Sequence, residues 1–351
     1  MVKRDSYHEQ QKKEQTKILN ALLKILPLFV TDYFHYMDQR TSINTQVAYA
    51  RNIQLFFSFM QASNPQYATY ELKDFKYSDM EKVSPADIEE YKRYLKVYEQ
   101  DGVERTNSER GIARKMSALR SLYGFLQRRE YITSNPCLYV DMPKLHEKEI
   151  IRMDPDEVAM LLDYVEEGDP SMTDQQRCYH EKTKIRDLAI FTLFLGTGIR
   201  ISELVGLDIG DIDFKNNCIK VVRKGGNEMF VYFGDEVHEA LEDYIVRERS
   251  HVIPQPGHEN ALFFSTQRKR LTARAIQNLV NKYTSHITAK HITPHKFRST
   301  YGTTLYKETG DIYLVADVLG HKDVNTTRKH YAAQDDERRR RAASYVTLRE
   351  K

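Results

Sequence analysis

The stretch LAIFTLFLGTGIRISELVGL, residues 188–207, decides the fold of the second half of this 351-residue chain. Its apolar start predicts a buried helix over residues 188–195, followed by a Gly-Thr-Gly break, Arg200 and a short helix to Leu207. A dinucleotide-binding loop is only weakly indicated, because the third glycine of that motif is missing and the preceding element is expected to be helical. The alternative is that the glycines turn the chain, so that Arg200 projects, rigidly held, from the junction of two packed helices.

Further along the chain, NCIKVVRKGGNEMFVYF (residues 217–233) has the alternation of two short strands. Gly225-Gly226 suits a tight hairpin turn between them. Lys224 is then expected near the hairpin tip. Taken alone, such a lysine is a solubilising surface residue.

Cationic side chains crowd into ITPHKFRST, residues 292–300. Thr293-Pro294 predicts a helix start, because threonine is a good N-cap and proline is favoured at the first helical position. Cations are unfavourable there, since the macrodipole places roughly half a positive charge at a helix N-terminus. His295 and Arg298 are three residues apart and share a face, so together they suit a phosphate, with Lys296 on the neighbouring face. The alternative is a solvated basic turn.

The segment YLVADVLGHKDVNTTRKHYAA, residues 313–333, contains two more candidates. His321 follows a Leu-Gly break, and Tyr331 comes ten residues later. A lone histidine or tyrosine is usually structural, so only the combination with the other segments gives these residues weight.

Composition limits the possible partners and compartments. Three distant cysteines, Cys137, Cys178 and Cys218, suggest neither a zinc site nor a disulfide framework, which fits a reducing cytoplasm. We expect no membrane segment and no signal peptide, because no apolar run is long enough. The formal net charge of +3 is modest, so a nucleic-acid partner must be inferred from where the charge lies.

Residues 20–140 are expected to be mostly helical. Over residues 44–60, one helical face carries Tyr49, Ile53, Phe56, Phe57 and Met60, and the other carries Asn44, Ala48 and Arg51. In TNSERGIARKMSALRSLYGFLQRR (residues 106–129), the predicted core stripe is Ile112, Met116, Leu119, Tyr123 and Leu126. The opposite face carries Arg110, Arg114, Ser117, Ser121 and Arg128.

That opposite face is basic and small, which suits an approach to duplex DNA. Residues 102–129 contain seven Lys/Arg against two Glu, a local net charge of +5. Guanidiniums can reach phosphates or guanine edges while the serines let the backbone lie close. The alternative is an ordinary solvated helix face.

Prolines and dense charge follow, and they predict a linker over residues 144–151 between domains at 1–143 and 152–351. Residues 166–182 are polar and aperiodic and are expected to form a surface insertion.

Six residues, taken in chain order, match the catalytic set of the tyrosine recombinases: Arg200, Lys224, His295, Arg298, His321 and Tyr331. The motifs GTGIRISELVGL, RKGG, TPHKFRST, LGHKDVNTT and HY carry this resemblance, which runs from about residue 20 to 340. The sequence is most similar to Xer-type recombinases and simple transposon integrases, because no extra arm-binding domain is expected before the first helical domain. Ser299 departs from the histidine frequent at that place in relatives.

The resemblance implies a mainly α-helical protein with a small β-hairpin in its C-terminal domain. An N-terminal, SAM-like core-binding domain and a C-terminal catalytic domain would clamp DNA between them. It also implies a specific double-stranded recombination site, a tetramer on two duplexes, and the chain after Tyr331 docking on a neighbour. An accessory protein is a further candidate partner. No cofactor or metal ion is implied.

The residue types suit phosphoryl transfer independently of the resemblance. Two arginines, Arg200 and Arg298, can bind the two non-bridging oxygens that gain charge in the transition state. His295 is the candidate base or proton relay, His321 a hydrogen-bond donor to phosphate, and Lys224 the general acid for the leaving oxygen.

Tyr331 completes the set as the nucleophile, and by the resemblance it becomes joined to the 3′ phosphate. Its ordinary pKa of about 10 means that its proton must be removed or its anion stabilised. The energy of the broken bond is then kept in the covalent intermediate, so that rejoining needs no ATP.

Three other functions compete with this interpretation. A metal-dependent nuclease needs clustered carboxylates, whereas Arg, Lys and His would repel a divalent ion. A type IB topoisomerase would nick and rejoin without exchanging partners, and a catalytically silent regulator would bind duplex without a covalent adduct. Whether the biological role is chromosome-dimer resolution, transposon movement or phage integration is not readable from these residues.

Overall fold

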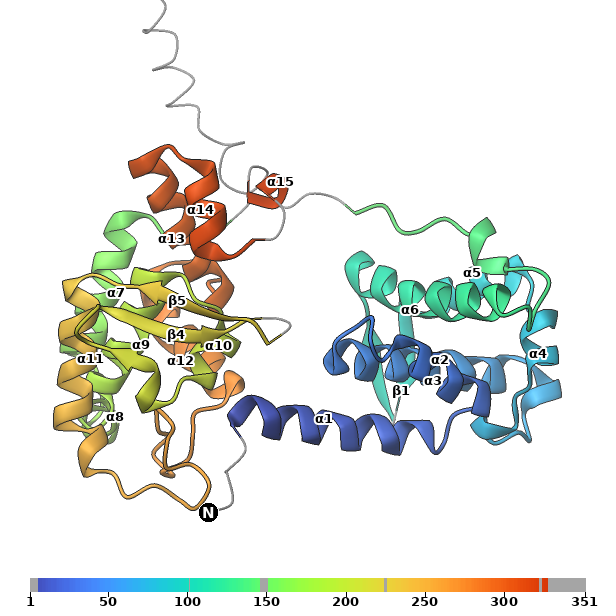
Figure 1. Cartoon of the computed structure of the whole chain (residues 1–351), viewed down its shortest axis with the longest axis horizontal. Helices are drawn as coiled ribbons and strands as arrows, with labels where there is room; N and C mark the ends of the chain where they lie inside the picture. Colours follow the sequence, from blue (N-terminus) through green and yellow to red (C-terminus); the bar gives the residue numbers. More distant parts are fainter. Residues whose placement is uncertain (1–5, 101, 146–150, 224–225, 322–323, 328–351) are drawn as a thin grey trace, which may run out of the picture. The chain divides into compact units, whose positions relative to one another are not determined.

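The computed structural model describes residues 6–100, 102–145, 151–223, 226–321 and 324–327. The chain divides into two compact units, Met1–Lys148 and Glu149–Lys351 (Figure 1). The division falls inside the stretch 144–151 that the sequence suggests as a linker. Each unit has its own secondary structure and is described separately below.

Unit 1 is helical for most of its length. Its α-helices are α1 (Tyr7–Leu23), α2 (Leu28–Met37), α3 (Ile43–Ser63), α4 (Tyr77–Lys82), α5 (Pro85–Tyr94) and α6 (Glu109–Arg128). Three short 3-10 turns join them: η1 (Pro65–Tyr67), η2 (Leu72–Asp74) and η3 (Pro136–Tyr139). Serine caps begin the two longest helices, because the Ser42 and Ser108 hydroxyls accept hydrogen bonds from the backbone N–H of Thr45 and Gly111.

The expected apolar stripes of α3 and α6 are confirmed as the core of unit 1. The α6 stripe is fully buried, and on α3 only Tyr49 of the expected core residues is half-buried rather than buried. Aromatic rings fill much of this core; the Phe56 and Tyr91 rings, for example, meet edge to face with centroids 5.1 Å apart. The aromatic contacts give the core geometric specificity beyond the burial of apolar area.

A hairpin interrupts the helices of unit 1, which the expectation of a mostly helical segment did not include. Strands β1 (Val97–Gln100) and β2 (Val103–Thr106) pair antiparallel, with Val97 opposite Thr106. Most of their side chains are exposed, so apolar periodicity gives little signal. Gly102, with φ +71°, supplies the left-handed turn residue.

Unit 2 surrounds a buried central helix with further helices and one small sheet. Its α-helices are α7 (Pro155–Glu167), α8 (Asp174–Glu181), α9 (Lys184–Thr197), α10 (Ile201–Gly206), α11 (Asp235–Arg247), α12 (Ala273–Ile287), α13 (Pro294–Thr309), α14 (Ile312–Leu319) and α15 (Val324–Thr327). The remaining elements are η4 (Ile209–Asp211), β3 (Ile212–Asp213), β4 (Cys218–Val222), β5 (Glu228–Tyr232) and η5 (Arg249–His251). The three strands form one antiparallel sheet in the order β3-β4-β5.

Helix α9 is the central helix that the opening stretch predicts. Residues 189–194 are all buried, and α9 packs against α7, α11 and α13. It ends at Gly198, which has a left-handed backbone with φ +62°. A Cβ at Gly198 would also lie 2.5 Å from a ring carbon of Tyr301, so both conformation and space require glycine here.

The expectation that residues 166–182 form an aperiodic surface insertion is wrong in part. Most of the segment is exposed, but it contains α8, which is capped by the Thr173 hydroxyl. His180 at the end of α8 is only 1% exposed, and its Nδ1 lies 3.4 Å from the Tyr283 hydroxyl. One buried side chain therefore fastens this segment to α12, and a single histidine is too weak a signal to predict that.

Candidate active site

Helix α13 begins where the sequence predicts. Thr293 is its N-cap residue and Pro294 its first residue, although the Thr293 side chain makes no capping hydrogen bond. His295 is exposed and Lys296 is half-buried at this helix start. The Ser299 hydroxyl donates to the His295 carbonyl at 3.2 Å, so the small residue at the unusual position is satisfied within its own helix.

Arg298 lies on the buried side of α13 and is only 2% exposed. Its guanidinium Nη1 donates to the Gly198 carbonyl at 2.7 Å, and Nη2 donates to the Leu319 carbonyl at the end of α14. A buried charge is costly unless it is hydrogen-bonded, and these two carbonyls supply acceptors. One side chain thereby joins three segments that are far apart in the sequence.

Arg200 lies at the junction of α9 and α10, as expected from the glycine break. It is the N-cap residue of α10, and Glu203 binds it twice: the carboxylate accepts from the Arg200 N–H at 2.9 Å and from Nη1 at 2.7 Å. The Arg200 side chain is 36% exposed and that of Glu203 only 2%. The guanidinium is therefore held by a buried carboxylate and is still accessible to solvent. The element before the glycines, α9, is a helix and not a strand, so the alternative of a dinucleotide-binding loop is excluded.

His321 follows the left-handed turn that ends α14. Gly320, with φ +61°, caps the helix, and the His321 N–H donates to the Ala316 carbonyl at 2.9 Å. The ring Nδ1 lies 2.7 Å from the Thr327 hydroxyl, and Thr327 itself is fully buried on α15. A buried threonine thus sets the orientation of the imidazole.

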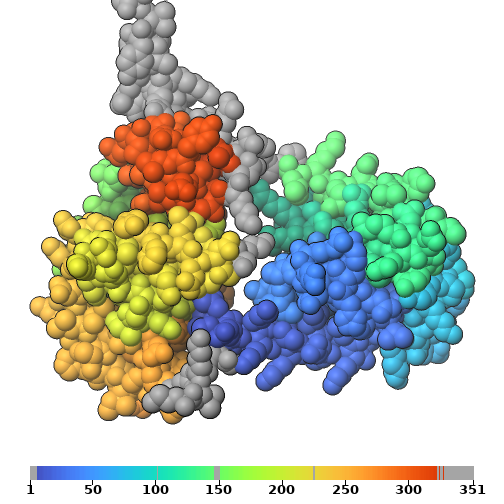
Figure 2. Space-filling model, in the orientation of Figure 1, coloured from blue at the N-terminus to red at the C-terminus, as the bar shows by residue number. Residues whose placement is uncertain are grey.

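The segments that carry three of the six predicted residues, Arg200, Arg298 and His321, are therefore brought together. The Gly198 carbonyl lies two residues before Arg200, the Leu319 carbonyl lies two residues before His321, and Arg298 binds both carbonyls. Lys224, Tyr331 and the chain after Tyr331 lie outside the described residues. In Figure 2 the segment around α14 lies beside the strands of the hairpin on the surface of unit 2.

Sequence reasoning missed two charged residues at this junction. Glu203 holds Arg200, and its spacing of three residues after an N-cap is the capping-box signal that could have identified it. Arg223 donates from Nη2 to the Val318 carbonyl at 2.8 Å, one residue before the carbonyl that Arg298 binds. No local pattern distinguishes Arg223 from any other strand-end cation.

The electrostatics of the junction are dominated by cations. Burial lowers the pKa of Arg223, nearby Arg200 lowers it further, and Glu203 opposes both effects. Within the described ranges, no group of three or more His, Cys, Asp or Glu residues could hold a metal ion. The arrangement is suited to receiving an anion.

On unit 1, the three arginines of the predicted DNA-binding face of α6, Arg110, Arg114 and Arg128, are exposed, and so is Arg51, the candidate DNA contact on α3. The serines are half-buried, and their hydroxyls make internal hydrogen bonds: Ser117 donates to the Ala113 carbonyl at 2.8 Å, and Ser121 accepts from Tyr33 at 2.8 Å. Both serines therefore have structural roles, whether or not they also lie near DNA. The DNA contacts of this face remain a prediction.

An aromatic residue that the sequence did not single out supports one of these arginines. The Arg128 guanidinium lies over the Tyr36 ring, 5.5 Å from its centroid, and that of Arg40 lies over the same ring at 4.1 Å. Cation–π contacts of this kind hold an arginine in place at an exposed site.

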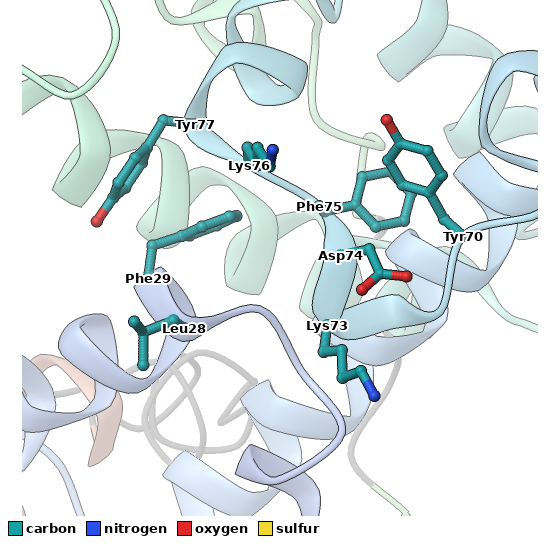
Figure 3. Close-up of a pocket in the computed structure, with 8 residues that line it drawn as sticks. All are labelled: Leu28, Phe29, Tyr70, Lys73, Asp74, Phe75, Lys76 and Tyr77. Atoms are coloured by element: carbon teal, nitrogen blue, oxygen red, sulfur yellow. The ribbon is translucent and has the colours of Figure 1, made fainter.

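A hollow of about 630 Å³ lies on unit 1. Figure 3 shows its lining, with the Phe29 and Tyr77 rings on one side. Its lining is Leu28, Phe29, Tyr70, Lys73, Asp74, Phe75, Lys76 and Tyr77. None of the predicted site residues lines it, so the candidate active site is a surface junction rather than this cavity.

No helix among the described segments is long and apolar enough to cross a membrane.

Both units match models of one protein family. Residues 152–338 match "Phage integrase family", and residues 30–130 match "Phage integrase, N-terminal SAM-like domain". The tyrosine recombinase XerD of Oceanobacillus iheyensis is 28% identical over 307 residues, covering 87% of this chain and 93% of that protein. The tyrosine recombinase XerS of Streptococcus pyogenes is 29% identical over 330 residues, covering 86% and 91%.

Solved structures share the fold at lower identity. An integrase of the transposon Tn1549, bound to a circular intermediate DNA, has a TM-score of 0.63 at 20% identity, covering 90% of this chain and 98% of that one. The XerH recombinase in a post-cleavage complex has a TM-score of 0.62 at 18% identity, covering 86% and 79%. Together with the family models, these likenesses confirm the predicted mainly helical, two-domain fold class. The chain belongs to the phage integrase family, the tyrosine recombinases.

Proposed function

We propose that this protein cuts and rejoins DNA at a specific site through a 3′-phosphotyrosine intermediate on Tyr331. The observation that carries the proposal is the position of Arg298, which is buried and bound to the carbonyls of both Gly198 and Leu319. This one guanidinium connects the segments that carry Arg200 and His321. A phosphoryl-transfer site needs such fixed cations, because it works by positioning and by stabilising charge.

In the proposed reaction, Arg200 and Arg298 bind the non-bridging oxygens of the scissile phosphate, and His321 donates a hydrogen bond to it. The Tyr331 oxygen attacks phosphorus as His295 accepts or relays its proton. The bond from phosphorus to the 5′ oxygen breaks, and Lys224 protonates that oxygen. A 5′ hydroxyl of a second strand reverses the step, which releases Tyr331.

The proposed partner is double-stranded DNA with a specific recombination site. Solved structures that share the fold contain DNA: the Tn1549 integrase with circular intermediate DNA, and XerH with its difH substrate. We infer that residues 1–143 and 152–351 of this chain act as core-binding and catalytic domains that close around the duplex. Arg51, Arg110, Arg114, Ser117, Ser121, Arg128 and Lys296 are the proposed DNA contacts.

Exchange between two duplexes implies four active sites, so we propose a tetramer, assembled in the cytoplasm. The relatives include Xer recombinases and a transposon integrase. Two biological roles follow from these likenesses: resolution of chromosome dimers, which serves chromosome partition at cell division, and movement of a mobile element. An accessory protein would be required only if the tetramer does not set the direction of exchange by itself.

A nicked duplex that carries one binding site tests the proposed chemistry. The site is first selected from random duplexes with the Tyr331→Phe protein, which should bind DNA normally because only a hydroxyl is lost. The unmutated protein should then form a covalent band on a denaturing gel, in EDTA, and Tyr331→Phe should form none. A persistent band with Tyr331→Phe would contradict the assignment of the nucleophile.

The same duplex and a supercoiled plasmid that carries two binding sites together separate the competing functions. Cleavage that needs magnesium and leaves no adduct would indicate a nuclease. An adduct with relaxation of supercoils but no exchange between two sites would indicate a topoisomerase. Binding without an adduct would indicate a regulator.

A further inference from the structure

Arg223 closes the turn of the β4–β5 hairpin. Its backbone N–H donates to the Asn227 carbonyl at 2.8 Å, and its own carbonyl accepts from the Gly226 N–H at 3.0 Å. Arg223 is thus the last residue on the β4 side before the turn, and Lys224 follows it directly in the sequence. A contact that fixes the Arg223 side chain therefore also restrains the backbone at the start of the turn.

The Arg223 side chain leaves its own hairpin and contacts α14. Nη2 donates to the Val318 carbonyl at 2.8 Å, across 95 residues of sequence. The guanidinium fits against Gly320 so closely that a Cβ at this position would overlap Nη1. Gly320 therefore serves two needs, a left-handed helix cap and a seat for Arg223.

The end of α14 is a suitable anchor for a cation. The last carbonyls of a helix lack intrahelical partners, and the macrodipole makes this end negative. Two guanidiniums take two consecutive carbonyls: Arg223 binds Val318, and Arg298 binds Leu319. The hairpin and helix α13 are thereby fastened to one turn, which leads directly into His321.

This anchoring is costly, which argues against an incidental contact. Burial lowers the pKa of Arg223, and among the residues that the structure describes, the Arg223 Nε is buried without a hydrogen-bond partner. A hairpin cation that served only solubility would extend into water and avoid both costs.

We propose that Arg223 is a positioning residue that ties the turn end of the β4–β5 hairpin to the α14 turn, and that the general-acid step assigned to Lys224, the next residue in the sequence, depends on this tie. The inference rests on the proposed role of Lys224 as the general acid. Arg223 itself acts through Lys224 and the α14 turn and does not transfer a proton.

Single-turnover cleavage of two substrates tests this role. One is the ordinary duplex, and the other has sulfur in place of the bridging 5′ oxygen, which departs readily as a thiolate and hardly needs a proton. Arg223→Ala should lose about 100-fold on the oxygen substrate, the scale expected when a catalytic group is misplaced by about an ångström. On the sulfur substrate its rate should return to within a few-fold of the unmutated rate, as for Lys224→Ala.

A second measurement tests the coupling without assuming how Lys224 acts. On the oxygen substrate, Arg223→Ala combined with Lys224→Ala should be no slower than Lys224→Ala alone, because the two residues act as a unit. Lys220→Gln, on the same hairpin, is the matched control for loss of charge. Its side chain pairs with Asp211 and Glu228 and not with α14, so it should cleave normally.

The outcomes separate this inference from the proposed chemistry. If sulfur rescues Lys224→Ala but not Arg223→Ala, Lys224 stays the general acid and the positioning role of Arg223 is wrong. If sulfur rescues neither, the general-acid assignment fails, and the double mutant decides about Arg223: additive losses would overturn its coupling to Lys224. Arg223→Lys serves as the second variant if Arg223→Ala unfolds, and it should show a smaller loss with the same rescue by sulfur.

Discussion

Two regions of the molecule present arginines, and they hold them in opposite ways. On α6 of unit 1, Arg110 and Arg114 extend from an exposed helix face. At the junction in unit 2, Arg298 is buried between two carbonyls, Arg200 is held by Glu203, and Arg223 is fastened to Val318. An exposed cation adapts to a phosphate and is screened by salt, whereas a fixed cation stabilises a particular charge distribution with little reorganisation.

The difference separates binding from chemistry. Mutations of the exposed face should change affinity and its dependence on salt. Mutations of the junction should change the rate of cleavage in DNA that is already bound.

The largest expected effect is that of Arg298→Ala. Cleavage should fall by about 10³-fold, the upper range for removing one preorganised donor. Unfolding should also become easier by about 1–3 kcal/mol, because the Gly198 and Leu319 carbonyls lose a buried partner. Single-turnover cleavage and thermal unfolding measure the two effects.

The matched control is Arg247→Ala, since Arg247 is exposed on α11 and pairs only with nearby Asp243 among the described contacts. It should change neither quantity. Cleavage by Arg298→Ala within tenfold of the unmutated rate would show that its buried guanidinium is purely structural.

Glu203→Gln should have the next largest effect. The amide keeps the shape of the N-cap contact but removes the charge that holds the Arg200 guanidinium. Cleavage should fall by roughly 10²-fold, because a misplaced catalytic cation loses most of its effect, while DNA affinity stays the same. If affinity falls instead and saturating DNA restores the rate, Arg200 belongs with the binding cations.

Arg110→Ala combined with Arg114→Ala should act in the opposite sense. Affinity should fall by about tenfold at moderate salt, and the slope of log K against log salt should become flatter by roughly one to two units if both residues contact phosphates. Cleavage at saturating DNA should not change. Binding titrations at several salt concentrations measure the slope.

Lys12→Ala combined with Lys17→Ala removes the same charge from the exposed surface of α1 and serves as the control. An equal change in slope for both double mutants would mean that α6 contributes only general charge. No change for the α6 double mutant would leave its face as solvated surface.

The smallest expected effect is that of Tyr36→Leu. Loss of the ring frees Arg128 and Arg40 from their cation–π contacts, which are worth about 0.5–1 kcal/mol at an exposed site. Affinity should fall only two- to fivefold if Arg128 contacts DNA, and Arg128→Ala should then add little in the Tyr36→Leu background. Additive losses would mean that the ring does not position Arg128.

Much of the fold was predictable because its signals are local. Each signal lies within or beside the element that it predicts. These signals are the apolar period of α6, the Thr293-Pro294 start of α13 and the glycines between β4 and β5. The β1–β2 hairpin and α8 were not predicted, because exposed strands and a polar helix leave no apolar period to read.

The sequence by itself determined the family, most of the helices, the β4–β5 hairpin and the candidate catalytic residues, because periodicity, caps and motif order are all written along the chain. Only the tertiary structure decided what holds those residues. Arg298 and Arg223 donate to backbone carbonyls, and Tyr33 donates to Ser121. In each of these hydrogen bonds the partners are 21 to 100 residues apart in the sequence. Residues so far apart meet only when helices pack, and the buried charges then take whichever backbone acceptors the packing places within reach.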